Sequence, residues 1–77
     1  MFKATIINRK QAIFEGRVNS VFLPGVEGEF EVMDSHKPII SLLKQGEIII
    51  NWEASLNITK GIIMVKDKEL IAVVDNN

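Results

Sequence analysis

The chain of 77 residues contains no cysteine, only two prolines, and a single histidine and a single tryptophan. Without cysteine it can form no disulfide, no thiolate nucleophile and no zinc–thiolate site, which is compatible with a reducing cytoplasm. Nine basic residues face ten acidic ones, for a formal net charge of −1. No cationic run is present to neutralise phosphates, so the sequence argues against nucleic-acid binding.

Long apolar runs are also missing. None approaches the roughly 20 residues of a membrane-spanning helix, and the amino-terminal MFKATIINRKQ has no apolar stretch long enough for a signal peptide. The twelve Ile and seven Val outnumber the five Leu and four Ala, and β-branched side chains favour a pleated sheet. Apolar residues make up 47% of this small chain, so we expect a partner to cover part of the apolar surface.

Short segments of alternating apolar residues run along the whole chain, and none keeps a helical period for three turns. We predict strands at residues 2–8, 12–23, 29–33, 39–43, 47–52, 56–59, 62–65 and 69–74. Turn residues recur about every 6–10 positions, which is typical of an antiparallel sandwich or barrel. The sequence therefore predicts one all-β domain over residues 1–77, with roughly eight to ten short strands.

The segment 12–23 is too long for one flat strand. Phe14, Gly16 and Val18 share one face, and the apolar positions then shift by one to Val21 and Leu23. Such a shift predicts a bulge near Asn19-Ser20, where the chain bends from one sheet toward another.

Three further features carry local predictions. The alternation of Ile48, Ile50 and Trp52 predicts that all three are buried, although a half-buried tryptophan also serves as an interface hot spot. Gly61 indicates a bulge or a close backbone contact. Asp67-Lys68 favours a tight hairpin.

The stretch from Leu23 to Gly46, LPGVEGEFEVMDSHKPIISLLKQG, combines turn residues, acidity and the only histidine. Pro24-Gly25 and Gly28 favour a turn. Four carboxylates fall within eight positions, at Glu27, Glu29, Glu31 and Asp34. His36 precedes Pro38, which suits the start of an edge strand because it cannot donate to a sheet. We expect the working surface here, and we expect it to bind a protein rather than to perform chemistry.

Metal binding is the first alternative. Glu27, Glu29 and Glu31 would share one face of a strand, with His36 close behind, and oxygen ligands suit Ca²⁺ or Mg²⁺. No D-x-[DN]-x-[DN]-G loop is present, however, and glutamates on an outer face are commonly just solvated. The sequence predicts neither a metal nor a cofactor.

Catalysis is the second alternative. The residue types of a hydrolytic triad are present as Ser35 or Ser41, His36 and Asp34. Neighbours on a strand point to opposite faces, so Ser35 and His36 could not pair as nucleophile and base. A carboxylate pair such as Glu29 with Glu31 would need a pocket that so small a core has no room for. A phosphate-binding G-x-x-x-x-G-K-[ST] loop is absent. We therefore predict no enzymatic activity. His36 fits either a partner contact or an exposed turn residue whose ring bonds a backbone carbonyl.

Several motifs resemble one family in order and spacing. They are F-x-G-x-V at 14–18, V-x-L-P-G-x-E-G-E at 21–29, H-x-P at 36–38, L-L-K-x-G at 42–46, G-I-I-M-V at 61–65 and L-I-A-V-V-D at 70–75. Together they resemble the epsilon subunit of bacterial F-type ATP synthase, over nearly the whole chain. The resemblance implies an antiparallel β-sandwich of about ten strands in two sheets.

The resemblance also implies a function. The family's domain is a non-catalytic rotor part at the foot of the central stalk, which joins the gamma subunit to the c-subunit ring so that proton flow drives ATP synthesis. Its acidic ring contact falls on Glu29, and its histidine near both partners falls on His36. Further expected partner contacts are Glu31, Met33, Ile39 and Ile40, the last three toward gamma. The implied location is peripheral, on the cytoplasmic face of the bacterial inner membrane, without direct membrane insertion.

The chain departs from the family's pattern in two places. Where the family commonly reads G-E-L-G-I-L-P-G-H, this chain reads GEFEVMDSH, so that Glu31 replaces a glycine and Asp34-Ser35 replaces Pro-Gly. The chain also ends directly after the expected sandwich, so we predict neither the family's carboxy-terminal helical brake nor its ATP site here. A rival hypothesis is a free-standing sandwich adaptor that binds a peptide by strand addition.

Overall fold

The computed structural model describes residues 1–34 and 36–76, and along these residues the chain forms nine β-strands. The strands are β1 (Phe2–Ile7), β2 (Ala12–Val18), β3 (Ser20–Gly25), β4 (Gly28–Met33), β5 (Ile39–Leu43), β6 (Gly46–Ile50), β7 (Ala54–Ile58), β8 (Lys60–Lys66) and β9 (Glu69–Asp75). Along the described residues no helix is long and apolar enough to cross a membrane.

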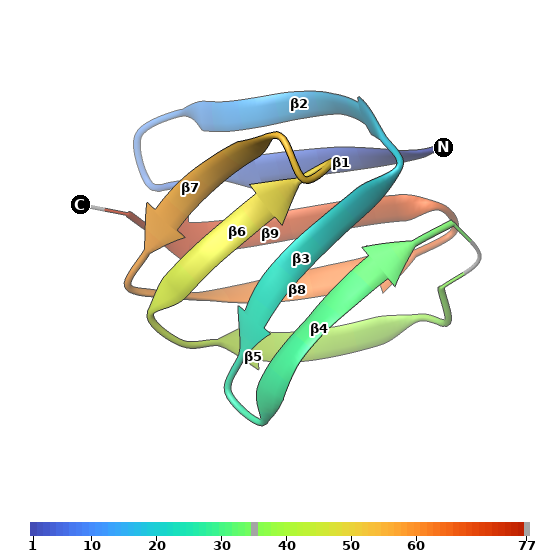
Figure 1. The fold of residues 1–77 in the computed structure, drawn as a ribbon. Coiled ribbons are helices and arrows are strands. Elements are labelled where there is room, and N and C mark those ends of the chain that lie inside the picture. Colours follow the sequence, from blue (N-terminus) through green and yellow to red (C-terminus); the bar gives the residue numbers. More distant parts are fainter. Residues whose placement is uncertain (35, 77) are drawn as a thin grey trace.

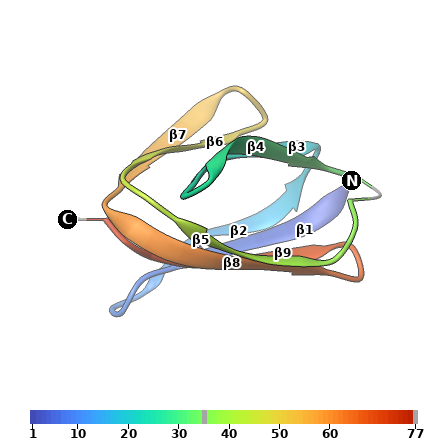
Figure 2. The ribbon, with the colours of Figure 1, turned by 90° about the horizontal axis from the view of Figure 1, so that it is seen from below.

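The strands follow one hydrogen-bonded path, β2-β1-β9-β8-β5-β3-β6-β7, with β4 added beside β3. The path folds over where β5 meets β3, through the single residue pair Gly25–Leu43. Two layers result: β2-β1-β9-β8-β5, here the large layer, faces β4-β3-β6-β7, the small layer (Figures 1 and 2). The predicted β-sandwich class is confirmed.

One pairing differs from the expected antiparallel arrangement. β1 and β9 run parallel, with Ala4 opposite Leu70 and Ile6 opposite Ala72. A tight hairpin forces two strands to be antiparallel, but β1 and β9 lie at opposite ends of the chain and no such turn joins them. Alternation along a single strand carries no information about this direction.

The core consists of the inward side chains of both layers. The largest fully buried apolar side chains are Ile6, Leu23, Ile48, Ile58, Ile63, Leu70, Val18, Val21, Val32 and Val74. Burying one isoleucine or leucine in this way contributes about 1.5–3 kcal/mol. Side chains alternate across each strand, so burying this set leaves a second set of side chains facing outward from each layer.

The chain changes layer at Asn19, between the buried Val18 of β2 and the buried Val21 of β3. The predicted bend near Asn19-Ser20 is confirmed. A side chain distant in sequence holds the crossover: Asn51 Oδ1 accepts hydrogen bonds from the backbone N of Asn19 at 2.7 Å and of Ser20 at 3.2 Å. The Asn51 backbone N also donates to the Ser20 carbonyl at 2.9 Å.

The predicted burial of Trp52 is wrong. β6 ends at Ile50, and the chain then turns through Asn51 and Trp52, whose φ angles of 52° and 54° are both left-handed. The turn takes Trp52 off the strand before it could point inward, and 59% of its surface is exposed. The predicted hairpin at Asp67-Lys68 is confirmed, with φ angles of 54° and 61°.

Candidate partner-binding surfaces

β4 places three of the predicted contact residues on one side of the small layer. Val32 is 1% exposed and faces the core, and Phe30 packs against it. Side chains alternate, so Glu29, Glu31 and Met33 point outward, and Met33 is 56% exposed. The sequence therefore placed these three side chains on the correct face.

His36 lies exposed between β4 and β5. Its backbone N donates to the Met33 carbonyl at 3.2 Å. Its Nδ1 lies 2.7 Å from the Lys37 carbonyl oxygen; a carbonyl only accepts, so Nδ1 carries the hydrogen and Nε2 remains available. The ring thus makes the backbone bond that the sequence allowed, and within residues 1–34 and 36–76 no hydrogen bond reaches its other edge.

A surface hollow brings four of the six predicted residues together. Glu29, His36, Ile39 and Ile40 all line it, between the β3–β4 turn and β5. Ile39 and Ile40 are neighbours on a strand, however, and point to opposite sides. Ile40 is 71% exposed, whereas Ile39 packs against the core. The expectation that both isoleucines are exposed is therefore wrong for Ile39.

The side chains around the hollow do not form a catalytic relay. Ser41 Oγ donates to the Leu42 carbonyl at 3.4 Å, and the His36 ring bonds the Lys37 carbonyl. Ser35 lies outside the described residues. Among residues 1–34 and 36–76, no group of three or more His, Asp and Glu side chains gathers as a metal site would require.

Asp34 begins the loop that carries His36. Its carboxylate pairs with the amino-terminal ammonium of Met1. That hydrogen bond is the main reason why the pKa of Asp34 lies below its ordinary value of 3.8. The contact therefore adds stability above that value and loses it as the pH falls through the lowered pKa.

The large layer presents an exposed apolar face, which sequence analysis found only in part. Cross-strand partners on β5, β8 and β9 form two rows, Ile40–Met64–Ile71 and Leu42–Ile62–Val73. The exposed fractions are 71% for Ile40, 57% for Leu42, 44% for Met64, 42% for Ile62 and 44% for Val73. These six residues are called the apolar face below. The available signal was that β5, β8 and β9 read as nearly continuous apolar runs, which normally indicates strands covered on both sides.

The small layer presents an aromatic cluster instead. The Trp52 indole Nε1 donates to Glu31 Oε2 at 2.8 Å, and the Trp52 ring lies 5.3 Å from the Phe22 ring, tilted by 44°. Phe22 and Glu31 are directly opposite each other on β3 and β4. Trp52, Phe22 and Glu31 are called the Trp52 platform below. The platform was not predicted from the sequence, because no local pattern links residues 22, 31 and 52.

The two layers also differ in charge. Residues 20–33 and 46–58, which form the small layer with its hairpin turns, contain five ionisable side chains, and all are glutamates. Residues 2–18, 39–43 and 60–75, which form the large layer, carry seven lysines or arginines and four carboxylates. A positively charged partner surface is therefore favoured at the small layer, and a negatively charged one at the large layer.

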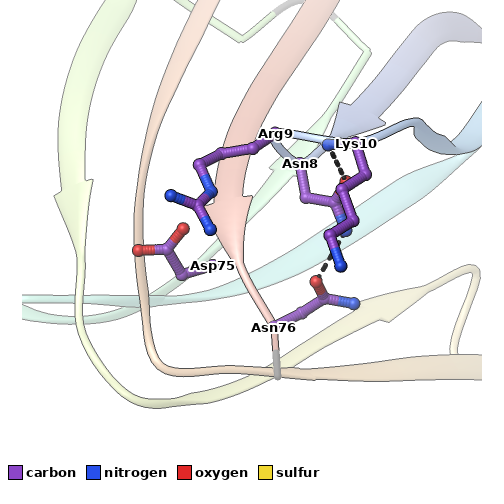
Figure 3. Close-up of a pocket in the computed structure, with 5 residues that line it drawn as sticks. All are labelled: Asn8, Arg9, Lys10, Asp75 and Asn76. Carbon is purple, nitrogen blue, oxygen red and sulfur yellow. Dashed lines mark hydrogen bonds between the residues drawn. The ribbon is translucent and has the colours of Figure 1, made fainter.

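A further hollow lies at the β1–β2 turn, beside the end of β9 (Figure 3). Asn8 organises it, since its Oδ1 accepts from the backbone N of Lys10 at 2.8 Å and its Nδ2 donates to Asn76 Oδ1 at 2.9 Å. The Arg9 side chain extends toward Asp75 (Figure 3), so charges of both signs line the hollow. This arrangement ties the first hairpin to the last strand and contains no nucleophile with an adjacent base.

Residues 1–76 match the family model described as "ATP synthase, Delta/Epsilon chain, beta-sandwich domain". The chain belongs to this family. The ATP synthase epsilon chain of Sulfurovum sp. (strain NBC37-1) is 34% identical over 97% of the chain, and that of Chlorobium limicola is 30% identical over 97%. The chain spans 62% of the Sulfurovum relative and 90% of the Chlorobium relative.

Solved structures agree with this delta/epsilon-chain fold. A chain in the structure of the Tetrahymena thermophila mitochondrial ATP synthase central stalk and c-ring superimposes with a TM-score of 0.81 at 15% identity. The match covers 96% of this chain and 63% of the other. A chain from the Euglena gracilis mitochondrial ATP synthase gives a TM-score of 0.80 at 19% identity, covering 92% of this chain and 48% of the other. At these identities the likeness establishes the fold.

Proposed function

We propose that this delta/epsilon-chain sandwich is a non-catalytic rotor part of a proton-translocating F-type ATP synthase. Residues 1–77 act as one domain that joins the gamma subunit to the c-subunit ring during ATP synthesis. The domain is peripheral, on the cytoplasmic face of the bacterial inner membrane. Family membership supports the assembly, and the exposed apolar face is the structural observation that carries the proposal.

The apolar face is the proposed seat for gamma. Six apolar side chains stand in two rows across three paired strands there. A stable interface needs about 800 Å² per partner, about a sixth of the 4999 Å² that the chain exposes. Ile40 belongs to this face, but Met33 points away from it, so a partner seated here does not reach Met33.

The β3–β4 end of the small layer is the proposed contact with the c ring. Glu29 and His36 line one hollow there, and Glu31 continues the same acidic edge. Complementary charge sets register and orientation more than affinity, which suits a contact that must hold two rotating parts in step. The close-packed core between the two surfaces transmits strain from one to the other.

The rival strand-addition adaptor has one observation in its favour. Among the described residues β4 pairs only with β3, so its other edge is open. That edge carries Glu29 and Glu31, and charged side chains on an edge strand discourage further pairing. The rotor proposal therefore explains more of the surface.

The test is the Glu29→Ala variant assembled into the synthase. We expect capture of gamma to survive, because Glu29 lies outside the apolar face, and the coupling of ATP hydrolysis to proton pumping to weaken. Glu69→Ala, on β9 of the large layer, removes the same charge elsewhere and is expected to leave coupling unchanged. Unchanged coupling in Glu29→Ala would remove that residue from the ring contact.

A further inference from the structure

Trp52 occupies a position that the fold does not require. It lies outside the core with 59% of its surface exposed. Its φ of 54° is a conformation that bulky side chains rarely adopt. A small or flexible residue would complete the β6–β7 turn more easily, so the presence of tryptophan calls for a reason other than folding.

The surrounding contacts hold the indole ring in one orientation. Phe22 supports it from the sheet at 5.3 Å between ring centroids, and Glu31 accepts its N–H at 2.8 Å. Glu31 uses Oε2 for this bond, and within residues 1–34 and 36–76 no hydrogen bond reaches its Oε1. The platform therefore presents an aromatic face beside a carboxylate oxygen that can accept another donor.

The charge of the small layer indicates what fits this platform. All five ionisable side chains of residues 20–33 and 46–58 are glutamates, so an anionic ligand such as a nucleic acid or an acidic lipid headgroup is repelled. A guanidinium group can stack on an indole and donate to a carboxylate at the same time. Tryptophan and arginine are also both enriched among the residues that carry the binding energy of protein interfaces.

We propose that the Trp52 platform binds an arginine side chain presented by a partner protein. The guanidinium stacks on the exposed face of the Trp52 indole and donates to Oε1 of Glu31. The platform shares Glu31 with the acidic edge of the proposed ring contact, but the β6–β7 turn that carries Trp52 lies at the opposite end of the small layer from the β3–β4 turn (Figure 1). It does not depend on the rotor assignment.

The probe is a capped glycine-rich peptide with two arginines, and its analogue with two citrullines, which keep the shape but lack the charge. Trp52 is the only tryptophan, so its fluorescence reports binding directly, and anisotropy of a labelled peptide reports it when Trp52 is replaced. We expect the citrulline peptide to bind about tenfold more weakly, because charge-assisted stacking and hydrogen bonding are lost.

Three variants separate the platform from general electrostatics. Glu31→Gln keeps an oxygen for the indole N–H and removes the charge, and we expect about fivefold weaker binding of the arginine peptide. Trp52→Ala removes the stacking face, and we expect it to weaken binding of the arginine peptide by at least as much. Glu69→Gln removes one charge from the large layer and is expected to bind as the parent chain does. All three sites are at the surface, and circular dichroism checks that each variant is folded.

Each outcome of the peptide-binding experiment either supports the proposal or overturns it. A preference for arginine over citrulline that Glu31→Gln and Trp52→Ala abolish, and that Glu69→Gln retains, supports the proposal. Equal binding of both peptides, no binding to the parent chain, or an equal loss in Glu69→Gln overturns it. A rotor assay has no part in this test, so failure here and failure of the coupling experiment are distinguishable.

Discussion

Gly61 on β8 lies directly against the backbone beside Val73 on β9. A Cβ added at Gly61 would come within 2.8 Å of the Val73 carbonyl oxygen and 2.9 Å of Cγ1 of Val74. Neither neighbour can move freely, since one is sheet backbone and the other is buried. The close contact that the sequence indicated at Gly61 is confirmed. Because glycine has no Cβ, β8 and β9 can pair here without a clash.

Gly61→Ala is therefore expected to destabilise the chain by about 1–3 kcal/mol, the usual range for overpacking. Urea denaturation followed by circular dichroism measures the change. Gly16→Ala is the matched control, because its added Cβ would lie 3.5 Å from the Phe14 ring, an ordinary contact. Similar midpoints for both variants would show that β8 and β9 adjust more easily than their packing implies.

Asn51 is expected to be the most sensitive polar residue of the small layer. Asn51→Ala removes the acceptor of two backbone N–H groups at the layer crossover, and it puts alanine at a φ of 52°. We expect a loss of about 1–3 kcal/mol, measured by thermal or urea unfolding. Asn51→Asp keeps both the acceptor and the tolerance of a left-handed φ, so its free energy of unfolding should remain close to that of the parent chain. An equal loss of stability in both variants would contradict the hydrogen-bond account.

Lys68→Gly is expected to stabilise the chain. Asp67 and Lys68 both have left-handed φ angles in the β8–β9 hairpin, where Asp-Gly is a favoured pair, and relief of the lysine's strain contributes about 1 kcal/mol. The midpoint of urea unfolding should rise. Lys66→Gly, two residues earlier inside β8, should lower it by about 0.5–1 kcal/mol because glycine weakens strands. A fall in both midpoints would argue against strain at Lys68.

Substitutions in the apolar face are expected to weaken binding of gamma without lowering the stability of the domain. Met64→Ser and Leu42→Ser replace exposed side chains, so the free energy of unfolding should change by no more than about 0.5 kcal/mol. Capture of gamma should nevertheless fall sharply in a pull-down. Met33→Ser changes an equally exposed apolar residue on the other layer and should capture gamma normally. If Met33→Ser alone lost capture, the small layer would be the gamma surface.

Local patterns correctly predicted burial wherever a strand is extended and has one face in the core. Val32 is buried and Met33 exposed, as the alternation on β4 predicts, and the shift from Val18 to Val21 correctly marked the change of layer. The same rule failed at Trp52, because alternation holds only while the backbone stays extended. The rule was not applied to Ile39 and Ile40, which were both expected to be exposed although strand neighbours face opposite sides.

The amino-acid sequence by itself determined the all-β class, most of the turn positions and most of the inward set of side chains, because burial of alternate apolar residues is a local property of an extended chain. Only the tertiary structure decided which outward residues stand together. Ile40 meets Met64, and Trp52 meets Phe22 and Glu31, through strand pairings and a left-handed turn. Those contacts join residues far apart in the chain, and no spacing along one strand specifies which strand lies beside it.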